Sequence, residues 1–209
     1  MSKPFGIGVI GMGWMGTVHS RAFRAVGERF PNLNVTTRLT VCADEIEKRA
    51  LEVCQRYGFE HHTHDWQRVV SDPDTHIVCI TAPNQWHLPI VQAACEAGKH
   101  VFCEKPVGRN SQETFACQRA AAKNPSLVTG VGYNYRWPPV VQYAKQLIQA
   151  GDLGQITHYR GRFLVDYGSN PDGVLSWRFR REVAGWGVLG DIMSHVIDMA
   201  HFLVGPLRQ

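Results

Sequence analysis

The stretch GVIGMGWMG, residues 8–16, decides the fold. It joins an apolar strand pattern at Gly6–Ile10 to a helical pattern through a turn with the spacing GxGxxG. In such a turn Gly11 permits the tight bend, Gly13 lets the backbone approach a pyrophosphate, and Gly16 lets the helix pack against the strand. The N-terminus of the helix then faces the anion. The order of strand, turn and helix predicts a dinucleotide-binding turn, although a purely structural glycine-rich turn has the same spacing.

Short apolar runs recur after this stretch and alternate with longer amphipathic segments. The segment from Leu88 to Ala97, for example, has Ala-rich helical spacing and is followed by Gly98, a typical stop signal. Strands that alternate with helices predict βαβ units and a doubly wound parallel sheet, which is an α/β fold of the Rossmann type. The expected strands are Phe5–Ile10, Leu39–Ala43, His76–Thr81, His100–Cys103 and Leu127–Gly132.

The pattern changes after the last of these strands. We expect residues 1–135 to form the dinucleotide-binding domain and residues 136–209 to form an incomplete second domain of α+β type. Val140–Ala150 has helical spacing and is stopped by a glycine. Gln155–Asp166 alternates between apolar and polar residues, which predicts a half-buried strand of a new sheet. Val188–Val204 is a strongly periodic helical segment that ends before a Gly-Pro pair.

The composition is that of an ordinary globular protein. Of the 209 residues 44% are hydrophobic and 19% charged, and the net charge of +4 is not gathered in the basic runs of a nucleic-acid binder. The apolar N-terminus is glycine-rich and lacks a signal-peptide cleavage site, and no run is long enough to span a membrane. A cytoplasmic location is therefore expected. The cysteines occur singly, without a CxxC pair, which is typical of reduced core residues: Cys42, Cys54, Cys79, Cys95, Cys103 and Cys117.

An acidic residue, Asp44, follows the second expected strand. A carboxylate at this place hydrogen-bonds the adenosine ribose and repels a 2′-phosphate, so Asp44, with Glu45 beside it, favours NAD over NADP. Asp44 lies further from the glycines than the usual ~20 residues, which we attribute to an inserted loop at Glu28–Thr37. An ordinary surface aspartate after a strand is the alternative interpretation.

Polar residues also follow the later strands, in the runs TAPNQWH, Thr81–His87, and CEKP, Cys103–Pro106. In an open α/β sheet, ligands bind at the carboxyl ends of the strands. Each of these residues taken singly is more typical of a turn than of a ligand contact, but their common position at one sheet edge favours a site. The cofactor contacts expected besides the three glycines and Asp44 are Trp14, Met15, Thr81, Pro83, Asn84, His87, Glu104 and Lys105.

A separate constellation lies on the predicted helix Val188–Val204. At 100° per residue, Asp191, His195 and Asp198 project within about 60° of one another beside an apolar stripe. Such a face suits an acid/base pair at the border of a pocket, while a solvated helix edge is the plainer interpretation. A metal site lacks a third ligand of obvious spacing. The cluster His61–His64 is better explained as part of a short edge strand and surface loop than as a metal site, so no metal is expected.

Several of these segments together resemble the Gfo/Idh/MocA oxidoreductase family, named for glucose-fructose oxidoreductase, inositol dehydrogenase and a rhizopine-catabolism protein. The resemblance covers nearly the whole chain, and the EKP run with the GxLxDxxxHxxD pattern is far more specific than the glycine fingerprint. The segments are GVIGMGWMG (8–16), TAPNQWH (81–87), AGKHVFCEKPVG (97–108), GYNYRWPP (132–139) and GWGVLGDIMSHVIDMAHFLVG (185–205).

The resemblance implies a nicotinamide cofactor on the first domain and a substrate pocket against an open antiparallel sheet of the second. It implies that Lys105, Asp191 and His195 form the catalytic set and that Asn134 and Arg136 join them in binding substrate. The family's usual GGG before the last helix is here GWG, residues 185–187. Family members run substantially longer, so the chain resembles a truncated form, and in the complete protein the sheet would serve to assemble a homo-oligomer.

The reaction expected from this resemblance is the NAD-dependent oxidation of a secondary hydroxyl of a sugar or cyclitol. His195 is the candidate base because imidazole titrates near neutral pH. Asp191 would orient the ring or bind a neighbouring hydroxyl, and Lys105 would stabilise the developing alkoxide. Two alternatives stay open: a glycosidase that oxidises and re-reduces its sugar with bound NAD, and a cofactor-binding regulator without turnover. The expected partner is a small polyol, with neither nucleic acid nor membrane.

Overall fold

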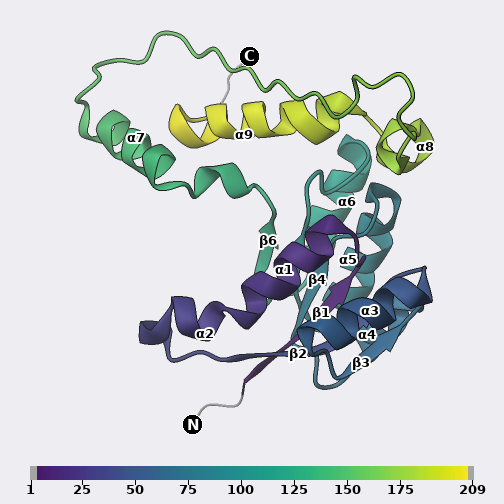
Figure 1. Ribbon diagram of the computed structural model, residues 1–209. Helices are drawn as coiled ribbons and strands as arrows, with labels where there is room; N and C mark the ends of the chain where they lie inside the picture. Colours follow the sequence, from purple (N-terminus) through teal and green to yellow (C-terminus); the bar gives the residue numbers. More distant parts are fainter. Residues whose placement is uncertain (1–3, 207–209) are drawn as a thin grey trace. The chain divides into compact units, whose positions relative to one another are not determined.

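The computed structural model describes residues 4–206 (Figure 1). The chain forms two compact units, and the boundary between them in the sequence lies between Val131 and Gly132. The boundary predicted from sequence lies four residues further along the chain. Within the described residues, no helix combines the length and the apolar character needed to cross a membrane.

The first unit contains a parallel six-stranded sheet with the order β3-β2-β1-β4-β5-β6. This arrangement confirms the doubly wound Rossmann-type sheet that the alternation of strands and helices predicts. The chain runs outward from β1 to β3 and then returns to the other side of β1 at β4, which creates the switch point beside β1. The strands are β1 (Phe5–Ile10), β2 (Thr37–Ala43), β3 (His61–Thr63), β4 (Ile77–Ile80), β5 (His100–Cys103) and β6 (Thr129–Val131).

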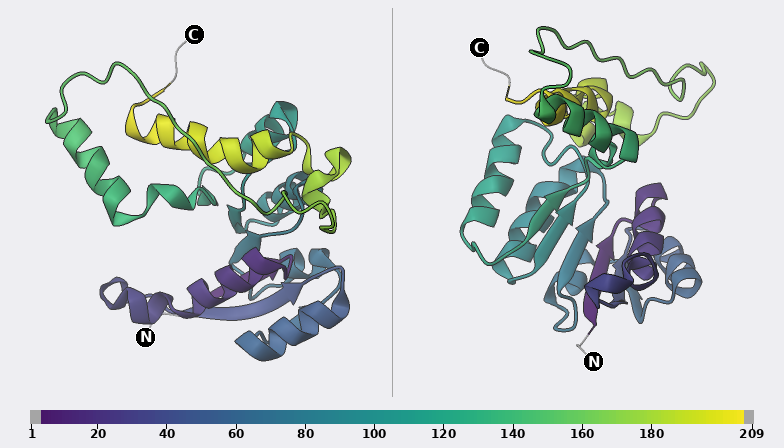
Figure 2. Two further views of the ribbon diagram at one scale, coloured as in Figure 1. Left: turned by 45° about the horizontal axis from the view of Figure 1, so that its top comes forward. Right: turned by 90° about the vertical axis from the view of Figure 1, so that its left-hand side faces the viewer.

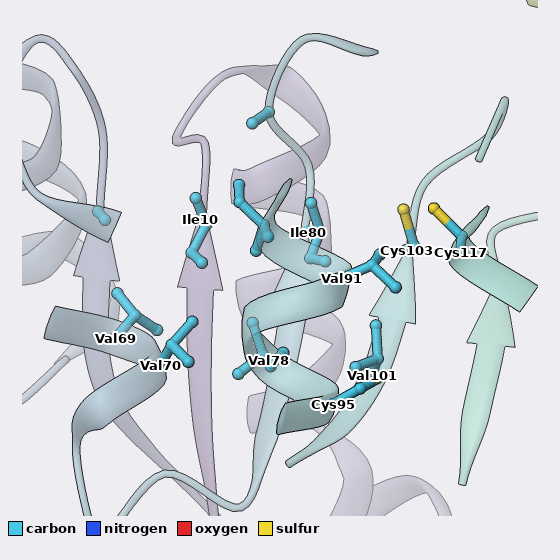
Figure 3. Packing of buried hydrophobic residues seen from close by; sticks show 14 of the residues in the cluster. Ile10, Val69, Val70, Val78, Ile80, Val91, Cys95, Val101, Cys103 and Cys117 are labelled. Atoms are coloured by element: carbon cyan, nitrogen blue, oxygen red, sulfur yellow. The ribbon is translucent and has the colours of Figure 1, made fainter. Parts of the chain in front are cut away.

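Helices cover both faces of this sheet and each face has its own core. On one face, β4 points Val78 and Ile80 toward helices α4, α5 and α6, as Figure 3 shows, and on the other it points Cys79 toward α1 and α3. The alternation follows from the period of two along a strand. In the right-hand view of Figure 2, helices lie on both sides of the strands. The helices are α1 (Trp14–Arg24), α2 (Val26–Arg29), α3 (Glu47–Tyr57), α4 (Trp66–Ser71), α5 (His87–Glu96) and α6 (Ser111–Ala122).

The cysteines are free thiols, as expected, and all but the half-buried Cys54 are buried. Cys103 and Cys117 belong to the same core cluster, and Figure 3 shows their sulfur atoms near each other between β5 and α6. Burial raises the pKa of Cys117 to about 11. These thiols therefore stay protonated near neutral pH and serve as small apolar core residues.

The second unit is built from helices and irregular segments. Helix α7 (Pro139–Ala150) confirms the predicted helix and ends at Gly151, whose φ of 80° is left-handed. Helix α9 packs against α7 and against the turn Asn134–Arg136. Further elements are the 3-10 turn Trp177–Phe179, the short helix α8 (Arg181–Ala184), a π-helical stretch (Leu189–Met193) and α9 (Ser194–Leu203).

For the second unit one expectation is wrong and one is confirmed only in part, since the chain is helical over 188–203 but not regularly so. Residues 155–166 form no strand, because a strand exists only through hydrogen bonds to a neighbouring strand and no other described segment of this unit is extended in a ladder. The predicted regular helix Val188–Val204 begins instead with a π-helical stretch, Leu189–Met193, before α9. A π turn takes an additional residue, so the 100° spacing does not hold across it.

Candidate cofactor and active site

The glycine-rich turn connects β1 to α1 and has the shape that its spacing predicts. Gly11 has a φ of 94°, and a Cβ added there would lie 2.5 Å from the backbone nitrogen of Ala82. A Cβ added to Gly16 would lie 2.1 Å from the carbonyl oxygen of Gly11. A Cβ added to Gly13, in contrast, would meet nothing within 4 Å. The fold itself therefore requires Gly11 and Gly16, whereas Gly13 faces open space.

The open space at Gly13 lies at the N-terminus of α1, an 11-residue helix. Gly13 is the N-cap residue and supplies no capping side chain, and the first turn contains no acidic residue. The first N–H groups of a helix carry a partial positive charge and need an acceptor from outside the helix. Gly13 and the start of α1 thus fit the pyrophosphate of a dinucleotide. Beside it Trp14 is 78% exposed and Met15 is half-buried.

Asp44 directly follows β2 and is buried, with its carboxylate against the glycine-rich turn. Its Oδ2 accepts a hydrogen bond of 2.7 Å from the backbone N–H of Met12, and its Oδ1 accepts one of 2.9 Å from that of Ile46. Arg49 Nη1 lies 3.2 Å from Oδ1. Arg49 Nη1 also lies 3.3 Å from Oδ2, so each carboxylate oxygen has one shorter bond from a backbone N–H and one longer contact with the guanidinium. Asp44 also fixes the position of the turn, which the sequence did not indicate.

Thr81 and Asn84 lie where β4 ends. The Thr81 hydroxyl donates to the carbonyl oxygen of Gly11 at 2.6 Å and so ties β4 to the glycine-rich turn. Asn84 is buried at the start of a 3-10 turn, Asn84–Trp86, that leads into α5, and Pro83 before it is half-buried.

His87, the first residue of α5, is only 1% exposed. Its Nε2 lies 2.9 Å from the carbonyl oxygen of Ala82 and its Nδ1 lies 2.8 Å from that of Pro106. Burial lowers the pKa of His87, although the two carbonyl groups oppose this effect. His87 thus joins the loops after β4 and β5 through their backbones.

The EKP run follows β5, and its glutamate has a partner that sequence reasoning missed. Glu104 is buried, and its Oε1 lies 2.8 Å from Nε2 of His19 on α1. Its Oε2 accepts a hydrogen bond of 3.2 Å from the backbone N–H of Lys105. The side chain of Lys105 is half-buried. His19 has no signal in the sequence because the pairing joins residues 85 positions apart.

These residues of the first unit share one edge of the sheet. They follow β1, β2, β4 and β5, which are paired in parallel, so the carboxyl ends of the strands lie side by side. Figure 3 shows this common direction for β1, β4 and β5, with Ile10, Ile80 and Cys103 near their ends. The edge includes the switch point at β1 and β4, where open α/β sheets bind their ligands.

A cavity of about 390 Å³ lies at the other end of α1. It is lined by Arg21 and Arg24 from the last turn of α1 and by Arg56 and Tyr57 from the end of α3. Because α1 rises about 1.5 Å per residue, the cavity is separated from Gly13 by roughly 15 Å of helix. It is therefore distinct from the candidate cofactor site.

In the second unit His195 lies on α9, is 8% exposed and is surrounded by aromatic rings. The Phe163 ring stacks on it with centroids 5.8 Å apart and an interplanar angle of 18°. Tyr133 and Tyr135 approach it edge-on, with centroids at 5.9 and 4.7 Å. Burial raises the pKa of Tyr133. His195 thus occupies a position with little access to water.

Asp191 and Asp198 each lie against an arginine of the second unit. Asp191 lies in the π-helical stretch, where its Oδ2 accepts a hydrogen bond of 2.9 Å from the Tyr167 hydroxyl and lies 3.4 Å from Nε of Arg178. Asp198 forms a bidentate ion pair with Arg136, in which Nε donates to Oδ2 at 2.8 Å and Nη2 donates to Oδ1. Asp191 and Asp198, which helical spacing assigns to one face, thus contact two different arginines, Arg178 and Arg136.

The predicted substrate residues Asn134 and Arg136 begin and end a 3-10 turn. The guanidinium of Arg136 is occupied by Asp198, and it also lies 5.5 Å from the centroid of the Phe202 ring. Arg136 thus fastens this turn to α9. Of the predicted catalytic set, Lys105 belongs to the first unit and Asp191 and His195 to the second. The described residues contain no group of three or more His, Cys, Asp or Glu that could hold a metal ion.

Comparison with known proteins agrees with this architecture. A family model described as "Oxidoreductase family, NAD-binding Rossmann fold" matches residues 5–133, and one described as "GFO/IDH/MocA C-terminal domain" matches residues 141–209. Levoglucosan dehydrogenase of Pseudarthrobacter phenanthrenivorans is 44% identical over 95% of this chain and 51% of its own length. The NAD⁺-dependent scyllo-inositol 2-dehydrogenase of Bacillus subtilis is 28% identical over 94% of this chain and 53% of its own length.

A solved structure of levoglucosan dehydrogenase in complex with NADH and L-sorbose superimposes with a TM-score of 0.93 at 43% identity. The superposition covers 96% of this chain and 53% of the chain in that structure. The chain thus spans about half the length of the relatives that it matches. It belongs to the Gfo/Idh/MocA oxidoreductase family, and its first unit is an NAD-binding Rossmann domain of that family.

Proposed function

We propose that this chain supplies the cofactor domain and the catalytic residues of an NAD-dependent dehydrogenase that oxidises a secondary hydroxyl of a sugar or cyclitol. The observation that carries the proposal is the shared sheet edge of the first unit. There a glycine-rich turn with open space at Gly13 lies at the switch point of the sheet, and Lys105 follows β5, which pairs with β4 beside that point. The names of the relatives, levoglucosan and inositol dehydrogenases, support the substrate class.

The cofactor proposal assigns a part of NAD to each end of this edge. Gly13 and the N-terminus of α1 hold the pyrophosphate, and Asp44 meets the adenosine ribose, where its charge disfavours a 2′-phosphate. When bound, NAD supplies the hydride acceptor. Further candidate contacts with NAD are Trp14 and Met15 at the start of α1, and Pro83 and Asn84 after β4.

The catalytic proposal gives each polar residue one task. Lys105 binds the substrate hydroxyl and stabilises the negative charge that develops on its oxygen. His195 takes the hydroxyl proton on a ring nitrogen, in aromatic surroundings that limit competition from water. Asp191 lies in a π-helical stretch, a feature frequent at functional sites, and orients the imidazole or a neighbouring hydroxyl.

A substrate panel tests the proposal in the protein that carries this chain. The panel contains levoglucosan, L-sorbose, glucose, myo-inositol, scyllo-inositol and a set of nitrophenyl glycosides, and the absorbance of NADH or NADPH and the release of nitrophenol are followed with each coenzyme. We expect NADH to accumulate with at least one of these polyols and to form faster than NADPH. Cleavage of glycosides without accumulation of NADH would indicate a glycosidase instead. Binding of NAD without turnover of any polyol or glycoside would indicate a regulator.

A further inference from the structure

The backbone of Lys105 is fixed on both sides by hydrogen bonds to neighbouring elements. On the N-terminal side, the Glu104 N–H donates to the carbonyl oxygen of Ile80 on β4 at 2.9 Å, and the Glu104 carboxylate accepts from the Lys105 N–H. On the C-terminal side, the carbonyl oxygen of Pro106 lies 2.8 Å from Nδ1 of His87. The direction in which the Lys105 side chain leaves the loop depends on these bonds.

The Glu104 carboxylate is held in turn by His19. The side chains of His19 and Glu104 are only 16% and 11% exposed, so the contact is shielded from water. Because an ionised carboxylate is only an acceptor, Nε2 of His19 is the donor. The His19 ring is itself held between Phe102, with centroids 5.1 Å apart, and Phe23, at 6.5 Å. These rings fix the direction of the N–H bond.

Removal of the His19 donor leaves one oxygen of a buried carboxylate without its partner. A buried carboxylate oxygen without a donor lowers the stability of the fold, unless it accepts from another donor or turns toward water. The nearest cation along the chain is the ammonium of Lys105 itself, which the carboxylate would attract. Either response breaks the hydrogen bond from Glu104 to the Lys105 N–H or draws the ammonium away from a substrate.

We propose that His19 is a positioning residue that acts through Glu104 to fix Lys105 for catalysis. The proposal rests on the proposed catalytic role of Lys105. His19 lies on the helix whose N-terminus forms the candidate pyrophosphate site, five residues after Trp14. One rigid element, α1, therefore sets the position of both the cofactor phosphates and the catalytic lysine. Other residues in the first unit, including His87, secure the same loop independently of α1.

Two substitutions at His19 separate the hydrogen bond from the packing. His19→Phe keeps an aromatic ring between Phe23 and Phe102 but has no donor, whereas His19→Gln keeps a donor of similar reach. His64→Phe is the matched control, because His64 is an exposed histidine of the same unit outside the candidate site. The measurements are hydrogen exchange of the Lys105 amide by NMR, NAD affinity by calorimetry, and steady-state kinetics with the best polyol of the panel.

In His19→Phe we expect exchange of the Lys105 amide to become about tenfold faster or more, since a hydrogen bond to a charged group is lost. We expect kcat to fall about ten- to hundredfold, the range seen for residues that orient the ligands of metal sites, with the KM for NAD unchanged. In His19→Gln we expect the exchange rate of the Lys105 amide and kcat to return to near the values of the unmodified protein, and in His64→Phe we expect neither to change. This separation of kcat from KM and the rescue by glutamine would not follow from a general loss of stability.

An unchanged Lys105 amide in a folded His19→Phe variant would overturn the proposal, as would a loss of turnover that glutamine does not restore. If His19→Phe does not fold, His19→Leu gives the same test, because leucine also lacks a donor for the Glu104 carboxylate. Faster exchange of the Lys105 amide is expected in this variant, and unchanged exchange would refute the proposal. Lack of turnover in the unmodified protein would refute the proposed function, while the amide measurement still decides whether His19 controls Lys105.

Discussion

Replacement of Gly13 by alanine is expected to weaken NAD binding without harming the fold. The backbone at Gly13 has φ −71° and ψ −161°, which alanine adopts without strain, and the added Cβ meets nothing within 4 Å. Reduced freedom of the unfolded chain favours alanine by ~0.4–1 kcal/mol, whereas alanine is the poorer N-cap residue, so the free energy of unfolding should change by less than about 1 kcal/mol. The methyl group, however, enters the space proposed for the pyrophosphate. Loss of one charge-assisted hydrogen bond there costs about 1.5–3 kcal/mol, or roughly ten- to hundredfold in Kd.

Two further glycines provide the controls for this experiment. Gly27→Ala lies outside the site, where the added Cβ lies 3.6 Å from its nearest neighbour, and should leave NAD binding unchanged. Gly16→Ala places a Cβ 2.1 Å from the carbonyl oxygen of Gly11 and should destabilise the domain by about 1–3 kcal/mol. Urea unfolding and NADH fluorescence titration measure the two quantities separately. A stable Gly13→Ala variant with the NAD affinity of the unmodified chain would refute the assignment of the pyrophosphate site.

Further predictions concern the cofactor, the catalytic set and pH. Asp44→Ser should weaken NAD binding and reduce the preference over NADP in parallel calorimetric titrations; a preference for NADP in the unmodified chain would contradict the role of Asp44. Lys105→Ala and His195→Ala should each lower kcat by about 10²–10⁴ with NAD affinity retained, and near-normal turnover in either would remove that residue from the catalytic set. Burial lowers the pKa of His87 from its ordinary value of 6.5, so its contribution to stability is complete above pH 6.5 and declines as the pH falls toward the folded-state pKa. Urea unfolding as a function of pH should show this decline in the unmodified chain and a smaller one in His87→Gln, and equal slopes would exclude His87 as its source.

The sequence predicts the first unit well because local rules and burial agree there. At Gly11 and Gly16 the chain itself leaves no room for a Cβ. The spacing of these glycines in the sequence therefore predicts the turn. The strands β1 and β4 are buried on both faces, and continuous apolar runs such as Ile77–Ile80 are typical of that environment. Each of these signals depends on neighbours close in sequence or on burial alone.

The second unit is less predictable because its features depend on distant partners. The alternation within 155–166 matches a strand, but alternation supplies no partner strand. The π-helical stretch Leu189–Met193 changes which side chains share a face, and a period calculated for a regular helix cannot show it. Arg136 has the chemistry of a substrate contact, yet its partner Asp198 lies 62 residues further along the chain.

For the candidate site residues, the sequence predicts the position in the fold better than the hydrogen-bond partner. It places Asp44 and Glu104 at the strand ends, which follows from the strand pattern. The hydrogen bond from the Met12 N–H to Asp44 and the contact between His19 and Glu104 arise from tertiary packing across 32 and 85 residues. Such contacts decide whether a polar residue binds a ligand, holds a loop or does both.

The fate of the carbinol hydrogen tests the central claim most directly. Levoglucosan, glucose and inositols deuterated at their carbinol carbons would be incubated with NAD and the protein that carries this chain, and the coenzyme analysed by mass spectrometry. A dehydrogenase of the proposed kind transfers one deuterium from the carbon to the nicotinamide, so deuterated NADH should accumulate in step with the oxidised sugar. Recovery of all deuterium in sugar products, with no deuterated NADH from any substrate, would contradict the account.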